Sequence, residues 1–442
     1  MRRFQIEQSD HELYTPQAGL ALVGLALNRY TDLRRSLRNI PKRHGIPNIE
    51  LIRAYVGQLC LGKSDFEAVD NARGDRFFLS ALGIRQLPSA ARLRQRFDQD
   101  ARALAEYVDA AAVDFVQRVG APITALHTGH VPLDIDVFPM DNSGTAKEGV
   151  SRTYHGFDGY APVAAYLGAE GWTVALELRE GSWHSQKEFT YVLERALEAS
   201  RRLTRAPLLV RLDSAHDARA NRAQLIQAGA DFIVKWNPRQ QDSEAWLAQA
   251  EREACWVQPR PGKRVGLLDQ RIEERLGEYT HTVRRVVRIT ERTIDRHGQH
   301  LLMPEIELEG WWTSLDTDTA DAEQVIALYA GHATSEQFHS EYKTDLDLER
   351  LPSGKFDTND LVLSCAALAY NILRWIGLAG LLGPQAPIRH GARRRRLRTV
   401  IQELMMLAAR LIHSGRRLRL RFGVHCPGLA SFRQVYHALA SG

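Results

Sequence analysis

Three acidic residues that lie far apart in the sequence could act together on a metal ion. Asp136 stands within one apolar segment and Asp213 at the end of another, where an ionised carboxylate is costly unless a cation compensates it. Carboxylate oxygens are the ligands that Mg²⁺ and Mn²⁺ prefer. A third acid is expected from a helix that begins near Asp321. It offers Glu336 and Glu341 on different faces, so at most one of them should point toward the strands.

Each of these acids has an alternative role. Asp134 lies two residues before Asp136 on the same strand face, so the alternation of side chains does not choose between them. An Asp that ends a strand, such as Asp213, often caps a helix or forms a turn. A surface salt bridge is the alternative for Glu336. Further motifs are needed to decide.

The segments that must position these acids predict a mixed α/β core. Apolar alternation and buried-looking runs indicate strands, and segments with helical spacing separate them. Strand, helix and strand in that order are typical of a βαβ arrangement. The expected elements are strands over 131–138, 161–168 and 172–179, a helix over 185–203, a strand over 206–213, a helix through Leu225 and a strand over 230–236.

The regions that flank this core differ in character. Residues 1 to about 120 are predicted to be helical, and Pro88 and Ser89 look like the start of a helix that carries Arg92, Arg94 and Arg96. This pattern resembles a helix-turn-helix, whose second helix can lie in a major groove, and a plain helical bundle is the alternative.

Between residues 237 and 309 the alternation of helix and strand is lost. The segments 281–293 and 301–315 have the residue types of strands, so we expect a β-rich insertion.

The end of the chain is strongly basic. From Arg389 onward there are twelve Arg, no Lys and one acid, Glu403, in a chain whose net charge is +5. A polyanion is the expected partner of such a tail, although a solvated basic surface has the same composition.

Cysteine usage and hydropathy exclude several classes of protein. The four cysteines form no CxxC pair, which argues against a zinc ribbon or a disulfide framework and favours a reducing cytoplasm. The start of the chain has no apolar signal segment. The most apolar stretch, 361–382, is interrupted by Asn371 and Arg374, so no membrane span is expected.

Three blocks of the sequence resemble DDE insertion-sequence transposases, most closely those of the thirteen-eighty family of bacterial insertion sequences. The blocks are LDIDVFPMDNSGTAKEGVSRTYHGFDGYAP, VRLDSAHD and YAGHATSEQFHSEYK. In the first, the family's LDxD strand points to Asp136, and Lys147, Glu148, Gly149, Tyr160 and Pro162 match its KEG turn and Tyr-x-Pro. In the third, Tyr329, Glu336 and Lys343 match a Tyr-Arg-Glu-Lys signature. His332 stands where the family has Arg.

The resemblance implies an RNase H-like mixed sheet with a mainly β insertion, flanked by helical N-terminal and C-terminal regions. The expected organisation is a helical DNA-binding region over 1–125, a catalytic core over 126–236 and 310–380, a β-rich insertion over 237–309 and a basic helical region over 381–442.

The resemblance also implies an activity. Asp136, Asp213 and Glu336 would hold two Mg²⁺ or Mn²⁺ ions, and in-line displacement at a phosphodiester would first cut the element's end and then join it to target DNA. Lys343, Tyr329 and His332 would lie near the DNA.

The partners implied are double-stranded DNA, as terminal inverted repeats and target, and a second copy in a dimeric synaptic complex. The expected location is the bacterial cytoplasm, on the nucleoid. A nuclease of the same fold without strand transfer, and a non-catalytic DNA-binding relative, remain as alternatives.

Overall fold

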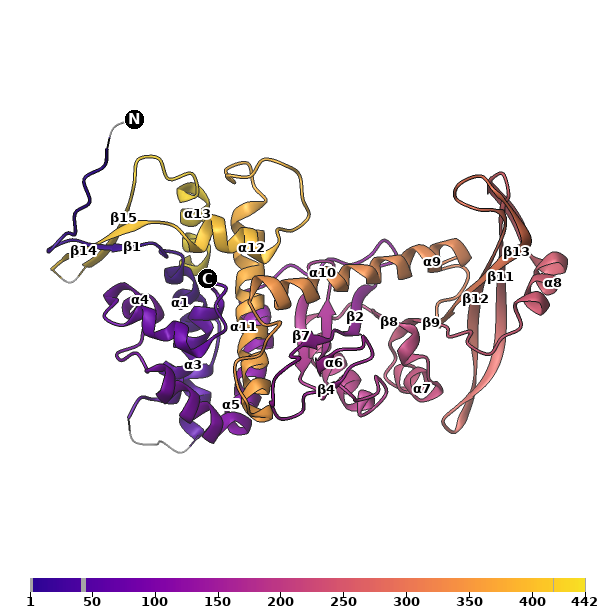
Figure 1. Cartoon of the computed structure of the whole chain (residues 1–442), viewed down its shortest axis with the longest axis horizontal. Coiled ribbons are helices and arrows are strands. Elements are labelled where there is room, and N and C mark those ends of the chain that lie inside the picture. The colour runs from indigo at the N-terminus through magenta and orange to yellow at the C-terminus, as the bar shows by residue number, and fades with distance from the viewer. Residues whose placement is uncertain (1–2, 41–44, 416, 442) are drawn as a thin grey trace.

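A computed structural model describes residues 3–40, 45–415 and 417–441 of the chain. The N-terminal and C-terminal regions lie together at one end, a central sheet follows, and long strands form the other end (Figure 1). Arg416, one of the twelve arginines of the tail, lies outside the described residues.

The central sheet begins with β2 (Val131–Val137). This strand pairs antiparallel with β6 (Val163–Leu167) and parallel with β8 (Leu208–Leu212). β7 (Trp172–Glu177) extends the sheet beyond β6, and β9 (Asp231–Lys235) extends it parallel to β8. The resulting order β7-β6-β2-β8-β9 is that of an RNase H-like sheet, as the sequence predicted.

Helices and short elements connect these strands. The connection between β7 and β8 contains α6, and η3 and α7 lie between β8 and β9. Their bounds are Phe189–Leu203 for α6, Ser214–His216 for η3 and Arg219–Gln227 for α7, and the loop between β2 and β6 holds β3 (Met140–Asp141), β4 (Ser151–Arg152) and β5 (Asp158–Tyr160).

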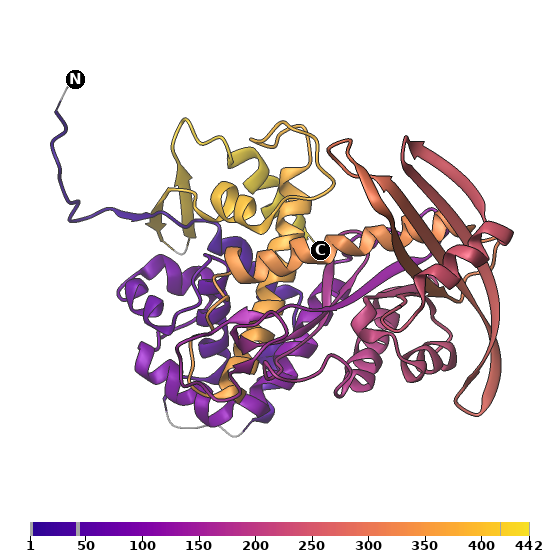
Figure 2. The same ribbon diagram turned by 45° about the vertical axis from the view of Figure 1, so that its right-hand side comes forward.

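The predicted β-rich insertion is present and continues the same sheet. One of its long strands, β11, has the alternating burial of a sheet that packs on one face, and β13 pairs antiparallel with β9, so nine strands form one sheet. The elements are α8 (Ser243–Glu253), β10 (Cys255–Arg260), β11 (Lys263–Leu276), β12 (Tyr279–Ile294) and β13 (His300–Thr313). Figure 2 shows these strands turned toward the viewer.

A helical rod returns from the insertion across the core (Figure 1). It starts at a capping box in which Asp321 and Gln324 each bond the other's backbone N–H. The rod changes its helix type along its length: α9 (Ala322–Ala330), the 3₁₀ turn η4 (Gly331–Ala333), α10 (Thr334–Ser340) and the π-helical turn η5 (Glu341–Asp345).

The rod leads to α11 (Phe356–Leu381), the central helix of the N-terminal and C-terminal regions. It packs against α3, α5, β7, α12 and α13. In the described part of the chain, α11 alone has the length and hydropathy of a membrane-crossing helix, but 94% of its apolar window is buried inside the protein.

Both ends of the chain pack around α11. The N-terminal elements are β1 (Leu13–Thr15), α1 (Leu20–Arg29), α2 (Leu33–Ser36), η1 (Leu37–Asn39), α3 (Asn48–Leu59), η2 (Phe66–Ala72), α4 (Arg76–Leu82) and α5 (Ala90–Arg118). The C-terminal ones are α12 (Leu397–Val400), η6 (Ile401–Met405), β14 (Ala409–Ser414), β15 (Arg417–Phe422) and α13 (Leu429–Ser441).

The C-terminal region differs from the helical one expected. β14 and β15 form a hairpin, and β1 from the other end of the chain adds a third strand to it. The basic tail therefore belongs to the same packed unit as the N-terminal helices.

Candidate active site

The sheet places two of the three predicted acids side by side. β2 and β8 run parallel, with Ile135 opposite Leu212, so Asp136 and Asp213 follow this pair at the same edge of the sheet. Asp134 and Arg211 are also opposite each other, and their side chains meet. Because alternate residues share a strand face, Asp136 and Asp213 point to the face where that ion pair lies.

Asp134 is occupied by a buried network. Arg211 donates two hydrogen bonds of 2.6 Å to its carboxylate, and His332 Nδ1 lies 2.9 Å from Asp134 Oδ1. Burial raises the pKa of Asp134, but Arg211 and His332 outweigh it and hold that pKa at about 2. Asp134 is therefore already bonded to two side chains, which distinguishes it from Asp136 two residues later.

The rod can approach this network because residue 331 is glycine. A Cβ on Gly331 would lie 2.5 Å from Arg211 Nη1, which donates a 2.6 Å hydrogen bond to the carbonyl of Leu328. Any larger residue at this position would push the rod away from the sheet.

Asp136 has no cation within bonding distance. Its Oδ1 accepts a 2.8 Å hydrogen bond from the backbone N–H of Val137, and Ser335 Oγ lies 3.4 Å from Oδ2. His339 Nδ1 is 4.0 Å from Oδ2, but burial lowers the pKa of His339 to about 3, so that ring is neutral. Burial and the nearby Asp213 raise the pKa of Asp136 to about 6.

Asp213 stands at the N-terminus of η3 and is more exposed than Asp136. His216 Nδ1 lies 2.6 Å from its Oδ1. Burial raises the pKa of Asp213, but the hydrogen bond and charge of His216 outweigh burial, so the pKa lies below its ordinary value. The carboxylate is therefore ionised and held in place by a neighbouring ring, with its other oxygen accessible.

Glu336 and Glu341 face different surroundings, as their spacing predicts. Glu341 is buried and pairs with Arg374, whereas Glu336 is exposed on α10. The charges of Asp136, Asp213 and Glu336 all act on the phenol of Tyr154, where they add to burial in raising its pKa. All three acids therefore lie within electrostatic reach of the Tyr154 phenol.

These three carboxylates are too far apart in this structure to share one metal ion. In the described ranges, no three His, Cys, Asp or Glu side chains are close enough together to hold a metal ion. The donor set nevertheless consists of carboxylate oxygens alone, and Asp136 lacks a compensating charge, which is the chemistry that suits Mg²⁺ or Mn²⁺.

The other residues of the third block divide into two groups. Tyr329 is half-buried, with its ring 5.6 Å from that of His332, and the charges of Asp213 and Asp136 act on its phenol. Lys343 Nζ donates to the carbonyl of Pro139 at 2.9 Å and lies 3.1 Å from Glu349, while its side chain keeps 28% exposure. Tyr329 therefore lies within electrostatic reach of Asp136 and Asp213, and Lys343 lies against the loop that follows β2.

His332 does not have the position expected for a DNA contact. It is buried, and Asp134 is its hydrogen-bond partner. Burial lowers the pKa of His332, but Asp134 and Asp136 outweigh it and raise that pKa above its ordinary value. The ring is therefore bonded to Asp134 together with Arg211, and these acids favour its protonated form.

The KEG turn of the first block has a structural role. Lys147 donates a 2.9 Å hydrogen bond to Asn142, and the hydroxyl of Tyr160 donates to the carbonyl of Glu148 at 2.8 Å. Gly149 has a φ of 79° and lies against Phe356 at the start of α11. These contacts tie the loop after Asp136 to α11.

The three predicted arginines of α5 lie in different environments. Arg92 is exposed and contacts only Gln95, and Arg94 pairs on the surface with Glu67. Arg96 is only 3% exposed and is bonded to Asp100 and to the carbonyl of Ile46. A DNA contact by Arg96, as expected from the sequence, conflicts with this burial.

Three residues of the site were not identified from the sequence. Arg211 stands two residues before Asp213, as Asp134 stands two before Asp136, and this parallel pattern in adjacent strands is a signal for their pairing. Ser335 and Tyr154 approach Asp136 from the rod and from the loop after β4. No spacing rule connects them to the acids.

Comparison with known proteins gives a family for the whole chain. The family described as transposase DDE domain, group 1, matches residues 19–441. No curated protein matches. Among solved structures, that of the piggyBac transposase synaptic complex with hairpin DNA is similar, with a TM-score of 0.38 and 9% identity over 90% of this chain and 83% of that one. The family match carries the assignment: the chain belongs to the DDE transposases.

Proposed function

We propose that this DDE transposase is encoded by a bacterial insertion sequence of the thirteen-eighty type, and that it cuts and joins DNA with Asp136, Asp213 and Glu336. The observation that carries the assignment of residues is the contrast on β2. Arg211 and His332 are bonded directly to Asp134, whereas among the described residues no cation is bonded to Asp136, on which the charge of His332 acts only from a distance. The family supports the reaction type, and the contrast supports the acid that takes part in it.

The metal fits the donor set described above. Asp136, Asp213 and Glu336 would hold two Mg²⁺ or Mn²⁺ ions. When bound, such ions activate the attacking oxygen and stabilise the leaving oxygen of an in-line displacement.

The residues around the acids have separate tasks. His216 orients the Asp213 carboxylate, and Ser335 lies against Asp136. Lys343 is near enough to the acids to exchange its contact with Glu349 for a DNA phosphate. Tyr154 and Tyr329 limit the space above the carboxylates from two sides.

The reaction consists of two displacements at phosphorus. Water attacks the phosphodiester at the end of the element, the bond to the 3′ oxygen breaks, and a 3′-hydroxyl and a 5′-phosphate result. That hydroxyl then attacks a target phosphodiester and displaces a new 3′-hydroxyl. No covalent intermediate with the protein forms, so the same three acids serve both steps.

The DNA partners follow from this reaction. Terminal inverted repeats would bind the N-terminal helices, where Arg92 and Arg94 are at the surface. Two ends must be brought together, so a dimer is expected on DNA. Its place of action would be the nucleoid in the bacterial cytoplasm.

The experiment that tests the proposal is excision from a supercoiled plasmid that carries the DNA flanking both sides of the coding region, with Mg²⁺ present. Asp136→Asn, Asp213→Asn and Glu336→Gln should release no element but should still bind the flanking DNA. The matched control is Glu323→Gln, an exposed acid in the first turn of α9, and it should cut as wild type does.

Two outcomes count against the proposal. Cutting by any of the three variants at the wild-type rate would show that the acid concerned is misassigned. Cleavage by wild type without joining to target DNA would support a nuclease of the same fold instead.

A further inference from the structure

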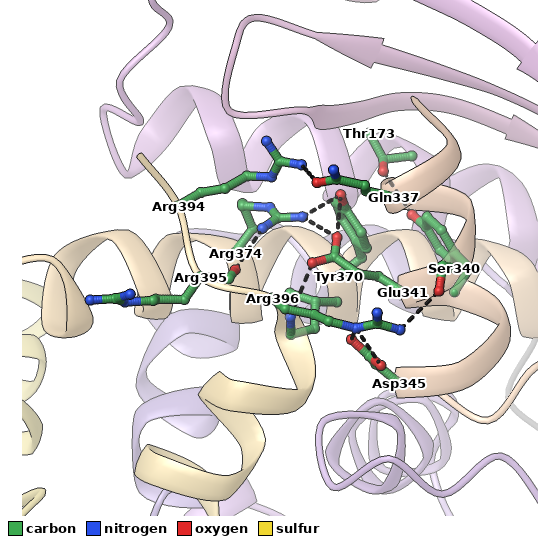
Figure 3. Close-up of polar contacts among 12 residues, drawn as sticks. Thr173, Gln337, Ser340, Glu341, Asp345, Tyr370, Arg374, Arg394, Arg395 and Arg396 are labelled. Carbon is green, nitrogen blue, oxygen red and sulfur yellow. Dashed lines mark hydrogen bonds and ion pairs between the residues drawn. The ribbon is translucent and has the colours of Figure 1, made fainter. Parts of the chain in front are cut away.

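A second charged site lies on the other side of α10. Residues 383–396 leave the end of α11 and cross back to this helix, where the run Arg393 to Arg396 contacts it (Figure 3). Arg393, Arg394 and Arg396 line a pocket of about 280 Å³ together with Gln337 and Glu341. We call this the arginine pocket.

Two arginines of the run hold the segment in place. Arg395 is buried and donates hydrogen bonds to three backbone carbonyls of residues 381–390. Arg396 Nε donates to both oxygens of Asp345, at 3.0 and 2.8 Å, and its Nη2 donates to Ser340 at 2.8 Å. The geometry of the pocket is therefore fixed by contacts that do not involve a ligand.

A buried network below the pocket consumes the one acid there. Glu341 pairs with Arg374, which also bonds the hydroxyl of Tyr370. The second oxygen of Glu341 accepts a 3.1 Å hydrogen bond from the backbone N–H of Leu397, and Arg374 donates to the carbonyl of Arg395 at 2.9 Å. Glu341 is thus bonded to Arg374 and Leu397, and it acts on Arg394 and Arg396 only through its charge at a greater distance.

Arg394 and Arg393 are left without an anion. Arg394 donates a 2.6 Å hydrogen bond to the amide oxygen of Gln337 and lies 4.5 Å from the ring of Phe338. Burial and the nearby Arg374 lower the pKa of Arg394, so these two surroundings do not stabilise the charge of its guanidinium group. Arg393 is exposed, and among the described residues it has no hydrogen-bond or ion-pair partner.

We propose that the arginine pocket binds a phosphate of the DNA backbone next to the phosphate that is cut. The planar guanidinium group matches the oxygens of a phosphate, and two such groups with no acid between them suit a phosphodiester. Gln337, which contacts Arg394, directly follows Glu336, so the pocket lies next to the third acid along α10. The inference rests on the proposed function, because it places the pocket relative to the cut.

The test is the salt dependence of binding to a short mixed-sequence DNA duplex, measured in EDTA so that no cutting occurs. Each phosphate contact contributes about one unit to the slope of log Kd against log salt concentration. Arg393→Gln and Arg394→Gln should each reduce the slope by about one, and the double variant by about two. Arg389→Gln removes the same charge from the same segment outside the pocket and should leave the slope unchanged.

A conservative variant separates charge from packing. Arg394→Lys should keep the slope but weaken binding, because an ammonium group contacts one oxygen where a guanidinium contacts two. The position is tested with flanking DNA in which single phosphates near the cut are replaced by neutral methylphosphonates. One such replacement should weaken binding by wild type and have no further effect on the double variant.

An unchanged slope in the double variant would overturn the inference, as would an equal loss in Arg389→Gln. The proposed function fails separately, in the excision experiment. If Asp136→Asn fails to cut and the double variant keeps the wild-type slope, only the arginine pocket is wrong.

Discussion

Asp134 and Asp136 lie two residues apart on β2 and face the same helical rod, yet their surroundings differ in charge. Arg211 and His332 are bonded directly to Asp134, whose pKa is about 2, whereas the charge of His332 acts on Asp136 only from a distance and the pKa of Asp136 is about 6. Arg211 and His332 are bonded to Asp134, and no comparable bond to a cation occupies Asp136 in the described residues. Asp136 is therefore available to bind a ligand. This difference is the reason why we propose Asp136, and not Asp134, as the acid that binds a ligand.

The largest expected effect is on stability, and it concerns Arg211. Arg211→Met leaves Asp134 with His332 alone, and breaking a buried ion pair costs about 3–5 kcal/mol. Chemical denaturation should show this loss in the free energy of unfolding. In Arg211→Met with Asp134→Asn, much of the loss should be recovered, because the unpaired charge is gone. Equal stability of wild type and Arg211→Met would show that Arg211 does not compensate the charge of Asp134. The contrast between Asp134 and Asp136 would then have no basis.

A metal should stabilise only the uncompensated side. Mg²⁺ at about one hundred times its Kd should raise the free energy of unfolding of wild type by about 2.7 kcal/mol. Asp136→Asn should show little of this gain in thermal melting. The matched control is Asp316→Asn, an exposed acid in the connection between β13 and α9, and it should respond as wild type does.

Without metal, Asp136→Asn should be more stable than wild type by about 1–2 kcal/mol. Burial and Asp213 oppose the charge of Asp136, and the amide removes that charge. Urea denaturation in EDTA measures the difference. A less stable variant would mean that the carboxylate is compensated by a contact that the structure does not show.

The smallest effect is the pH dependence that comes from His332. Its pKa is raised in the folded chain, so its contribution is complete below the ordinary histidine pKa of about 6.5 and is lost as the pH rises through the folded value. Wild type should therefore lose stability relative to His332→Asn as the pH rises above about 6.5. A difference that stays constant with pH would show that His332 is neutral throughout.

Local sequence patterns predicted the core of this fold. Apolar alternation located β2, β6, β7 and β9, and the loss of alternation after residue 237 located the insertion. The spacing of Glu336 and Glu341 correctly predicted different faces. These features depend on neighbours within a few residues, which is the information that one sequence contains.

Features that depend on distant partners could not be predicted in this way. The hairpin of β14 and β15 is rich in arginine, and its third strand, β1, comes from the other end of the chain. Arg96 is buried and bonded to Ile46 and Asn48, which precede it by 50 and 48 residues. The choice between Asp134 and Asp136 required Arg211, on a different strand.

The assignment of Asp136, Asp213 and Glu336 as metal ligands is tested most directly by counting the Mn²⁺ ions bound per chain in the complex with flanking DNA. The electron paramagnetic resonance signal of Mn²⁺ gives this number. We expect about two ions for wild type and the loss of at least one in each of Asp136→Asn, Asp213→Asn and Glu336→Gln. Glu323→Gln should keep both. The same number of ions in all three acid variants as in wild type would contradict the assignment of these acids as metal ligands.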